Sequence, residues 1–547
     1  MDNALSRIAL ASPPTLLEIF LYVIVASFLL VTIYRLTLHP LAKYPGPLRY
    51  KISGWPLVYQ CYKGNRHLYS LRDHEKYGPI VRTSPNSLSF SSPKALHQIY
   101  GSRAINVRKS KFYETLDAGP GGATTHTEID KERHAARRRI LNHAFSEAAI
   151  RETETFVIDN VGKFIKLIGP NDSENDEGWS TPRNMSDWLN WMAYDIMGNL
   201  VFGKSYNCLG SEEHREMPRL MTEGTKFGYW FAYLPCAPVL QPLAKTSFMQ
   251  WIGGDTVRDN AVLGEYAISQ FEERAALEKR RLEGKEKPPT HKDLMHYLLN
   301  NFDPKTGMRP TTDELKGDTL SLIGAGADTI ATTLSAAFFY LARNESVLRR
   351  LLSEIRNTFG CLDEIHSSPK MDSCVYLNAC IEETLRLAPA VASQLPREVM
   401  RGGIVIDGEY VPEGIVVGVP SYVVHHTREA FPQSWSFQPE RWIAGSELAD
   451  HSTVVSKEDI ARAREAMCPF SLGSRGCIGK TFAYMEMRIA LASVLWSYDF
   501  KEVGGRERKG GGGRDLEIGR ERQDEFQIFD CFGADRDGPV LRFRKRE

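Results

Sequence analysis

Residues 470–479 read FSLGSRGCIG, and the interpretation of the whole chain begins from them. They fit the pattern F-x-x-G-x-R-x-C-x-G, whose five fixed positions would recur by chance in a chain of this length on the order of once in ten thousand sequences. A cysteine thiolate needs backbone N–H donors to stabilise its charge, and glycines let such a loop approach a large bound group. The pattern therefore predicts that Cys477 binds a metal as a thiolate.

The other fixed positions suit the surroundings of such a thiolate. Arg475 can pair with a carboxylate of the bound group, Phe470 can pack beneath the sulfur and keep water away, and Gly479 permits close approach. The alternative is that Cys477 is a small buried hydrophobic residue, as most free cysteines are. That interpretation applies to the other eight cysteines, which are Cys61, Cys208, Cys236, Cys361, Cys374, Cys380, Cys468 and Cys531. Their scatter, without any CxxC pair, argues against a disulfide framework and a structural zinc site.

The loop resembles the haem-binding signature of the cytochrome P450 superfamily, and the resemblance extends over nearly the whole chain. It implies a haem-thiolate monooxygenase of mainly α fold with small β-sheets at its edges. The cofactor would be haem b with Cys477 as axial ligand. Electrons would come from NADPH through NADPH–cytochrome P450 reductase, with cytochrome b5 as an optional second donor. The chain looks most like fungal microsomal members that oxidise secondary metabolites such as terpenoids, polyketides or alkaloids.

The N-terminal part predicts a membrane anchor. Residues 16–34 are apolar apart from Glu18 and a few hydroxyl side chains, and as a helix they span about one bilayer core. Arg7 is the only basic residue before this run, whereas four basic residues follow it, namely Arg35, Lys43, Arg49 and Lys51. By the positive-inside rule, residues 1–15 are lumenal and the catalytic body faces the cytosol from the endoplasmic reticulum membrane. A cleaved signal peptide fits less well, because no small-x-small site ends the run.

The rest of the chain is expected to form a proline-rich hinge at 35–50 and a single domain at 51–547. Helical periodicity dominates from about 128 to 387, and short strand-like runs lie near 80–90, 404–411, 415–419 and 540–544. The glycine-rich, charged segment 504–525 predicts an exposed, mobile loop. Sixty-eight basic and 68 acidic residues cancel, so charge gives no argument for nucleic acid as a partner. The expected partners are membrane lipid and a small apolar substrate.

The segment IGAGADT at residues 323–329 lies within a helical stretch of about residues 312–343. Small residues in mid-helix let other groups approach, and a local bulge there can open a pocket. The segment resembles the family's A-G-x-D/E-T motif. That resemblance assigns proton delivery for oxygen activation to Asp328 and Thr329 and places Ala325 beside the haem. The alternative is a helix-packing patch with a solvated Asp328.

Three charged residues are expected to form a structural network. Glu383 and Arg386 lie at i, i+3 in the segment ETLR, which makes them neighbours on one helix face. Arg441 lies in PERW, between that helix and the cysteine loop. This order resembles the family's E-x-x-R helix and P-E-R-F/W segment, in which the three form a buried network. All members are needed, because a stranded buried charge is costly.

Further basic residues are candidates for binding the haem propionates together with Arg475. By the resemblance, Arg138 falls on the arginine of the family's W-x-x-x-R helix, and His134 replaces the usual Trp. Arg397, in the segment PRE, is a further contact. The same helix also carries Lys131, Arg133, Arg137 and Arg139. These four predict either a solvated helix face or part of a docking surface for an acidic redox partner.

The resemblance alone supplies the expected substrate contacts, which are Phe112, Ala325, Val391, Leu395 and Phe529. The aromatic run at 227–234 predicts either core packing or a loop that dips into the membrane. Two other functions stay open. One is a haem-thiolate isomerase or dehydratase that uses no external electrons, and the other is a non-catalytic membrane haem-binding protein. Retention of Asp328 and Thr329 argues against both.

Overall fold

The computed structural model describes residues 16–116, 122–170, 178–240, 246–287, 291–448 and 454–546. Its helices are α1 (Leu16–Ile33), α2 (Leu48–Ile52), α3 (Trp55–Tyr62), α4 (Arg66–Tyr77), α5 (Pro93–Tyr100), α6 (Phe112–Leu116), α7 (Lys131–Ala144), α8 (Glu147–Ile168), α9 (Met185–Phe202), α10 (Glu216–Ala232), α11 (Ala237–Leu240), α12 (Ser247–Leu282), α13 (Leu294–Asn300), α14 (Thr312–Arg343), α15 (Glu345–Thr358), α16 (Pro369–Asp372), α17 (Val375–Leu387), α18 (Ser421–His425), α19 (Lys457–Ala466) and α20 (Lys480–Ser497). Residues 1–15, predicted to be lumenal, lie outside the described residues.

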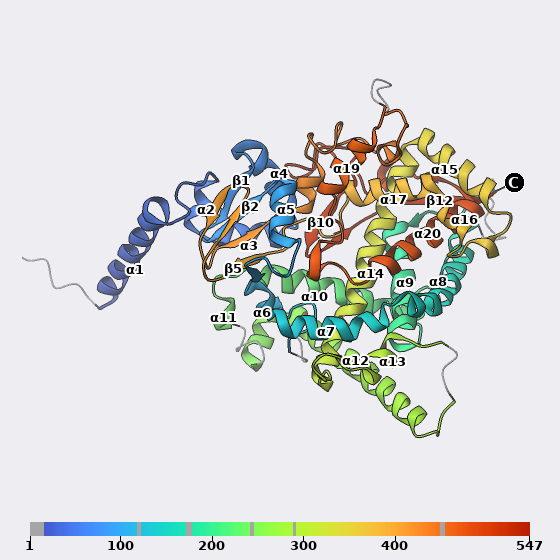
Figure 1. Ribbon diagram of the computed structural model, residues 1–547, viewed down its shortest axis with the longest axis horizontal. Helices are drawn as coiled ribbons and strands as arrows, with labels where there is room; N and C mark the ends of the chain where they lie inside the picture. The colour runs from blue at the N-terminus through green and yellow to red at the C-terminus, as the bar shows by residue number, and fades with distance from the viewer. Residues whose placement is uncertain are drawn as a thin grey trace, which may run out of the picture.

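The strands form four small sheets. The largest has the order β1 (Ile80–Ser84), β2 (Ser87–Phe90), β8 (Val416–Gly418), β5 (Arg397–Val399) and β3 (Val107–Lys109). The others are β4 (Arg183–Asn184) with β12 (Val540–Lys545) and β9 (Tyr498–Glu502), β10 (Ile528–Cys531) with β11 (Gly533–Arg536), and β6 (Ile404–Ile406) with β7 (Glu409–Val411). The prediction of a mainly α body with small sheets is confirmed, and Figure 1 shows these sheets around a helical core.

Helix α1 projects from the body as a separate apolar rod (Figure 1). Within the described residues, two helices are long and apolar enough to cross a membrane. The N-terminal one, Leu16–Leu38, has a mean hydropathy of 2.6 and is not buried at all. The other is α14, which is 67% buried and is therefore a core helix. The predicted anchor thus has the length and exposure of a membrane-spanning helix.

Helix α14 is the central element of the body. A capping box starts it, because the Thr311 side chain accepts from the backbone N–H of Glu314 while the Glu314 carboxylate accepts from the backbone of Thr311. From Ile330 to Leu341 every residue is buried, and the helix packs against α9, α17 and α20. Its apolar surroundings fix the position of residues 323–329, which lie in its middle.

The glycine-rich segment 504–525 is more ordered than its composition predicts. The backbone N–H groups of Gly512 and Gly513 donate to the carbonyls of Arg522 and Arg520, at 3.0 and 2.9 Å. The buried Arg520 side chain in turn donates to the Asn65 side chain at 2.6 Å. Residues 514–518 are exposed, as expected, but the glycine run is packed against the body. The prediction of an exposed segment is therefore wrong for residues 510–513, which are half-buried.

Candidate active site

The cysteine loop, residues 470–479, contains a short turn at Gly473–Arg475 and ends where α20 begins. The backbone N–H of Cys477 donates to the carbonyl of Phe470 at 2.8 Å, which closes the loop. Gly473 has φ +65°, and a side chain there would collide with the carbonyl oxygen of Tyr100. The Phe470 ring packs 5.3 Å from the ring of Tyr484. These contacts hold the backbone of the loop in place.

The Cys477 thiol is surrounded by protein on most sides. Burial raises the pKa of the thiol, while the backbone N–H of Gly479 and the charge of Arg138 act in the opposite direction. The side chain is nevertheless accessible to solvent. A residue that is surrounded by protein and yet accessible borders an internal cavity. Ala325 is similar, since it is exposed in the middle of α14 between the buried residues Ile323 and Ala327.

The acid and the alcohol of α14 lie beside Ala325. Thr329 Oγ1 donates to the Ala325 carbonyl at 2.8 Å, and Tyr194 OH lies 3.5 Å from a carboxylate oxygen of Asp328. Burial raises the pKa of Asp328 to about 6, although the nearby Arg536 lowers it. Asp328 is therefore a half-buried acid that can hold a proton near neutral pH, and the alternative of a solvated surface carboxylate is disfavoured.

The glycines of this segment serve packing. An added Cβ at Gly324 would lie 2.8 Å from the Met221 side chain of α10, and one at Gly326 would collide with the Met197 side chain of α9. Helix α14 is continuous from Thr312 to Arg343. The expected local bulge is therefore absent, and two methionine side chains occupy the room that the glycines leave.

A group of cations borders a cavity of about 350 Å³ next to the cysteine loop, and its lining includes the predicted residues His134, Arg138, Arg397 and Arg475. Lys109 also lines it, directly opposite Arg397 in the β3–β5 ladder. Like charges opposite each other destabilise a sheet unless an anion lies between or beside them. No sequence motif pointed to Lys109, because a single lysine in a three-residue strand has no recognisable pattern.

The electrostatics of this group fit a dianionic ligand. Burial and then Arg397 lower the pKa of Arg475 to about 10, and burial followed by the same arginine lowers the pKa of Lys109 well below its usual value. Burial and then Arg475 lower the pKa of His134 to about 2, so its imidazole is neutral. The cations therefore oppose one another's charge, and two carboxylates would relieve that repulsion. Haem, with two propionates and an iron for Cys477, fits this donor set.

The arginines already make bonds that orient them. Arg138 donates to the Gly476 carbonyl at 2.8 Å, which ties α7 to the cysteine loop. Arg397 donates to the Pro396 carbonyl at 3.2 Å. Arg475 donates to three successive backbone carbonyls in the loop before α7, those of Glu128, Ile129 and Asp130.

The structure brings Glu383, Arg386 and Arg441 together behind the site. The Glu383 carboxylate accepts two bonds from Arg386, at 2.9 and 2.8 Å, and lies 3.5 Å from Arg441 Nε. It also accepts from the Trp442 indole at 3.0 Å. Burial opposes the charge on this carboxylate, but the two arginines hold the pKa of Glu383 below its usual value. The arrangement is a buried, multiply bonded charge network.

The residues expected to contact the substrate lie in different surroundings. Phe112 lies in an aromatic cluster whose other members are Tyr113, Tyr229, Tyr233 and Phe532. Two of these, Tyr229 and Tyr233, come from the aromatic run 227–234, which therefore packs partly in the core. Val391 and Leu395 are half-buried. Phe529 is 38% exposed and lies under the Arg520 guanidinium at 4.1 Å, away from the cluster. Phe532, which no pattern indicated, occupies the place beside Phe112.

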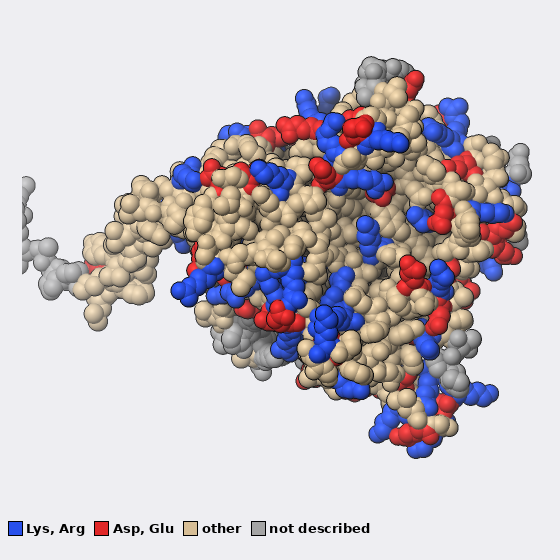
Figure 2. Space-filling model, viewed as in Figure 1, with Lys and Arg blue, Asp and Glu red and all other residues tan. Residues whose placement is uncertain are grey.

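The basic residues of α7 differ in exposure, and three of them are ion-paired. The side chain of Arg137 is only 1% exposed and pairs with Asp318 at 2.8 Å, so a solvated or docking role is wrong for it. Arg133 pairs with Glu314 at 2.5 Å, and Arg139 pairs with Asp303 at 2.6 Å. Figure 2 shows Lys and Arg side chains gathered on the face where α6 and α7 lie, and those lining the cavity there include Arg103, Arg108 and Lys131.

Comparisons with known proteins agree with this geometry. A family model described as Cytochrome P450 matches residues 45–510. The cytochrome P450 monooxygenase fscF of Fusarium equiseti is 34% identical over 530 residues, which cover 96% of this chain and 95% of that protein. The cytochrome P450 monooxygenase poxM of Penicillium oxalicum is 36% identical over 515 residues, 94% of this chain and 92% of that protein. The crystal structure of the cytochrome P450DA heme domain has a TM-score of 0.66 over 88% of this chain and 93% of its own, and at 16% identity it shows the fold alone. The chain therefore belongs to the cytochrome P450 family.

Proposed function

We propose that this monooxygenase inserts one oxygen atom from O2 into a small apolar secondary metabolite, using electrons that a membrane-bound reductase takes from NADPH. The observation that carries the proposal is an accessible cysteine in a hydrogen-bonded loop, next to a cavity that is lined by His134, Arg138, Arg397 and Arg475. The fungal origin of the similar monooxygenases supports a terpenoid, polyketide or alkaloid as substrate.

Haem held by the Cys477 thiolate would supply an electron-rich iron, which favours cleavage of the O–O bond. Arg138, Arg397 and Arg475 would bind the propionates, with Lys109 as a fourth cation and neutral His134 as an N–H donor. Arg138 on α7 and Arg397 on β5 would then hold the cofactor from two different elements.

Proton delivery belongs to Asp328 and Thr329. A carboxyl group whose pKa is about 6 can both take a proton from water and release it near neutral pH. Tyr194 orients the Asp328 carboxylate from the side of α9. The Thr329 hydroxyl donates to the Ala325 carbonyl at 2.8 Å, and rotation of its side chain away from that bond would free the hydroxyl proton for donation on the side of Ala325.

The proposed membrane location is supported by α1 and by exposed aromatic side chains on α3. Trp55, Tyr59 and Tyr62 are 55%, 59% and 67% exposed, and Trp and Tyr favour the membrane interface. We infer that this face rests on the endoplasmic reticulum membrane and that the body faces the cytosol, where NADPH–cytochrome P450 reductase and cytochrome b5 would supply electrons.

The test is the absorption spectrum of the reduced, carbon-monoxide-bound protein. The wild type should show the strongly red-shifted Soret band of a thiolate ligand, and Cys477→Ser should lose it. Cys361→Ser is the matched control, since Cys361 is an exposed cysteine outside the cysteine loop, and it should keep the band. A band at the imidazole position in the wild type, or a protein without haem, would refute the proposal.

A further inference from the structure

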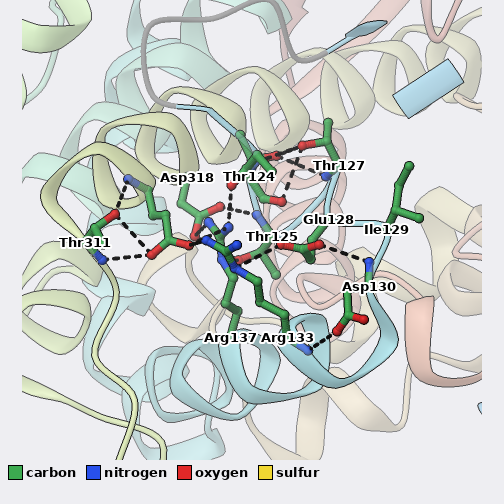
Figure 3. A network of polar contacts seen from close by, with 12 residues as sticks. Thr124, Thr125, Thr127, Glu128, Ile129, Asp130, Arg133, Arg137, Thr311 and Asp318 are labelled. Carbon is green, nitrogen blue, oxygen red and sulfur yellow. Dashed lines mark hydrogen bonds and ion pairs between the residues drawn. The ribbon is translucent and has the colours of Figure 1, made fainter. Parts of the chain in front are cut away.

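A buried polar triangle joins the loop before α7 to α7 and to the core helix α14 (Figure 3). The Asp318 carboxylate on α14 accepts from the Thr125 backbone N–H at 2.5 Å and from the Thr125 hydroxyl at 2.8 Å. It also accepts from Arg137 Nη2 at 2.8 Å, and Arg137 Nε donates back to the Thr125 hydroxyl at 3.0 Å. Thr125, Arg137 and Asp318 are all buried, at 7%, 1% and 4% exposure.

The triangle lies at one end of the helix face that borders the internal space. Asp318 precedes Ala325 by seven residues, which is two helical turns, so the two side chains point from the same face of α14. Thr329 lies one further turn along that face. Asp318 therefore stands about 10 Å along the helix from the accessible alanine, at a rise of about 1.5 Å per residue.

The same loop is held at its other end by the cysteine loop. Residues 122–130 pass from the triangle to the backbone carbonyls that accept from Arg475. Arg137 reinforces the first end by donating to the Ala123 carbonyl. A continuous set of polar contacts thus runs from α14 through residues 122–130 to Arg475, at the cationic edge of the cavity.

We propose that Thr125, Arg137 and Asp318 form a latch that positions residues 122–130 against the haem edge and so keeps haem in its site. The latch touches neither haem nor substrate, and it acts through the carbonyls that orient Arg475. The proposal rests on the proposed function, because it takes haem to occupy the space between α14 and the cysteine loop.

A neighbouring ion pair offers a matched control. Arg139 lies two residues beyond Arg137 on α7 and binds Asp303 through two nitrogens, at 2.6 and 2.8 Å. Asp303 follows α13, and no contact with residues 122–130 is found for it among the described residues. Loss of this pair should weaken α7 locally without releasing the loop.

The experiment measures the rate at which the full-length, haem-loaded protein in detergent transfers haem to excess apomyoglobin. Asp318→Asn and Thr125→Val should each accelerate transfer about tenfold, the equivalent of losing one hydrogen bond to a charged group. Asp303→Asn, which breaks the control pair from the side that does not line the cavity, should leave the rate near wild type. Both latch variants should keep the red-shifted carbon-monoxide band, because Cys477 is untouched. Trypsin should also cleave the latch variants faster after Lys131 and Arg133.

A double variant distinguishes a role of the latch in haem retention from a role in thermal stability alone. Arg137→Met with Asp318→Leu replaces the buried charges by apolar groups, which often restores stability, but it leaves Thr125 without its acceptor. The latch predicts recovered thermal stability with haem transfer still fast. Recovery of slow transfer in this variant, or wild-type transfer rates in Asp318→Asn and Thr125→Val, would overturn the proposal. A wild type that binds no haem would instead refute the proposed function.

Discussion

Single residues set the charge of the site. Lys109 and Arg397 lie opposite each other on antiparallel strands, and Arg475 depresses the pKa of both Lys109 and His134 after the larger effect of burial. Such a concentration of positive charge is unfavourable without an anion. An anionic ligand such as a haem propionate would therefore be stabilised by these cations.

The role proposed for Thr329 gives a prediction at this scale. In Thr329→Ala the hydroxyl beside Asp328 is lost, while the helix keeps its backbone bonds and gains a residue of high helix propensity. We expect NADPH consumption to continue, with most of the oxygen released as hydrogen peroxide instead of product. Thr333→Ala is the control, because its hydroxyl donates to the Thr329 carbonyl and its side chain is buried. Tight coupling of NADPH to product in Thr329→Ala would contradict the role.

At the scale of elements, the glycine run in the segment 504–525 is explained by close approach of two backbone stretches. A side chain at Gly511 would lie 2.5 Å from the Gln523 carbonyl, and one at Gly512 would collide with the carbonyls of Arg520 and Arg522. Gly510 also accepts from the Gln527 backbone N–H at 2.7 Å. These contacts hold residues 510–512 against residues 520–527, and Arg520 in turn binds Asn65, the N-cap of α4.

Gly512→Ala should therefore destabilise the fold. Inserting a methyl group into a closely packed site costs about 1–3 kcal/mol, and we expect the free energy of unfolding to fall by that amount. Gly504→Ala serves as the comparison, because its added Cβ would meet nothing within 4 Å. Chemical denaturation of the two variants is the measurement. Equal stability of both would mean that the glycine run tolerates side chains.

For the whole molecule, stability depends on pH through buried carboxyl groups. Glu486 on α20 is 1% exposed, and neither carboxylate oxygen has a hydrogen-bond partner among the described residues. Burial raises the pKa of Glu486 to about 8. Burial likewise raises the pKa of Glu525 to about 7, an effect that Tyr422 and Arg522 oppose. The folded chain therefore keeps these protons to higher pH than the unfolded chain, so stability is greatest at low pH within this window and falls as pH rises toward 8.

Glu486→Gln should remove part of that pH dependence. Between the unfolded pKa near 4.5 and the folded pKa of about 8, the glutamate costs about 1 kcal/mol of stability per pH unit, and a neutral amide does not. We expect the loss of melting temperature between pH 6 and about pH 8 to be smaller in Glu486→Gln. Glu465→Gln, at an exposed position on α19, should behave as wild type. An unchanged pH profile in Glu486→Gln would show that this carboxyl group is ionised in the folded protein.

The sequence by itself determined the family, the mainly helical fold and the apolar N-terminal helix, and it indicated Cys477, Asp328 and Thr329 as candidate site residues, because each depends on local pattern. A loop that must approach a cofactor needs its glycines in order, and a membrane helix needs about 20 apolar residues in a row. The charge network of Glu383, Arg386 and Arg441 was also foreseen, since its two segments carry recognisable motifs.

Only the tertiary structure decided what depends on packing between distant segments. It placed Lys109 opposite Arg397, Phe532 beside Phe112, and Phe529 on the surface. It turned Arg137 from an expected surface cation into one corner of a buried triangle with Asp318, 181 residues away along the chain. A pattern on one helix gives the face on which a residue lies, but the partner that covers that face is fixed by long-range packing, which local periodicity does not encode.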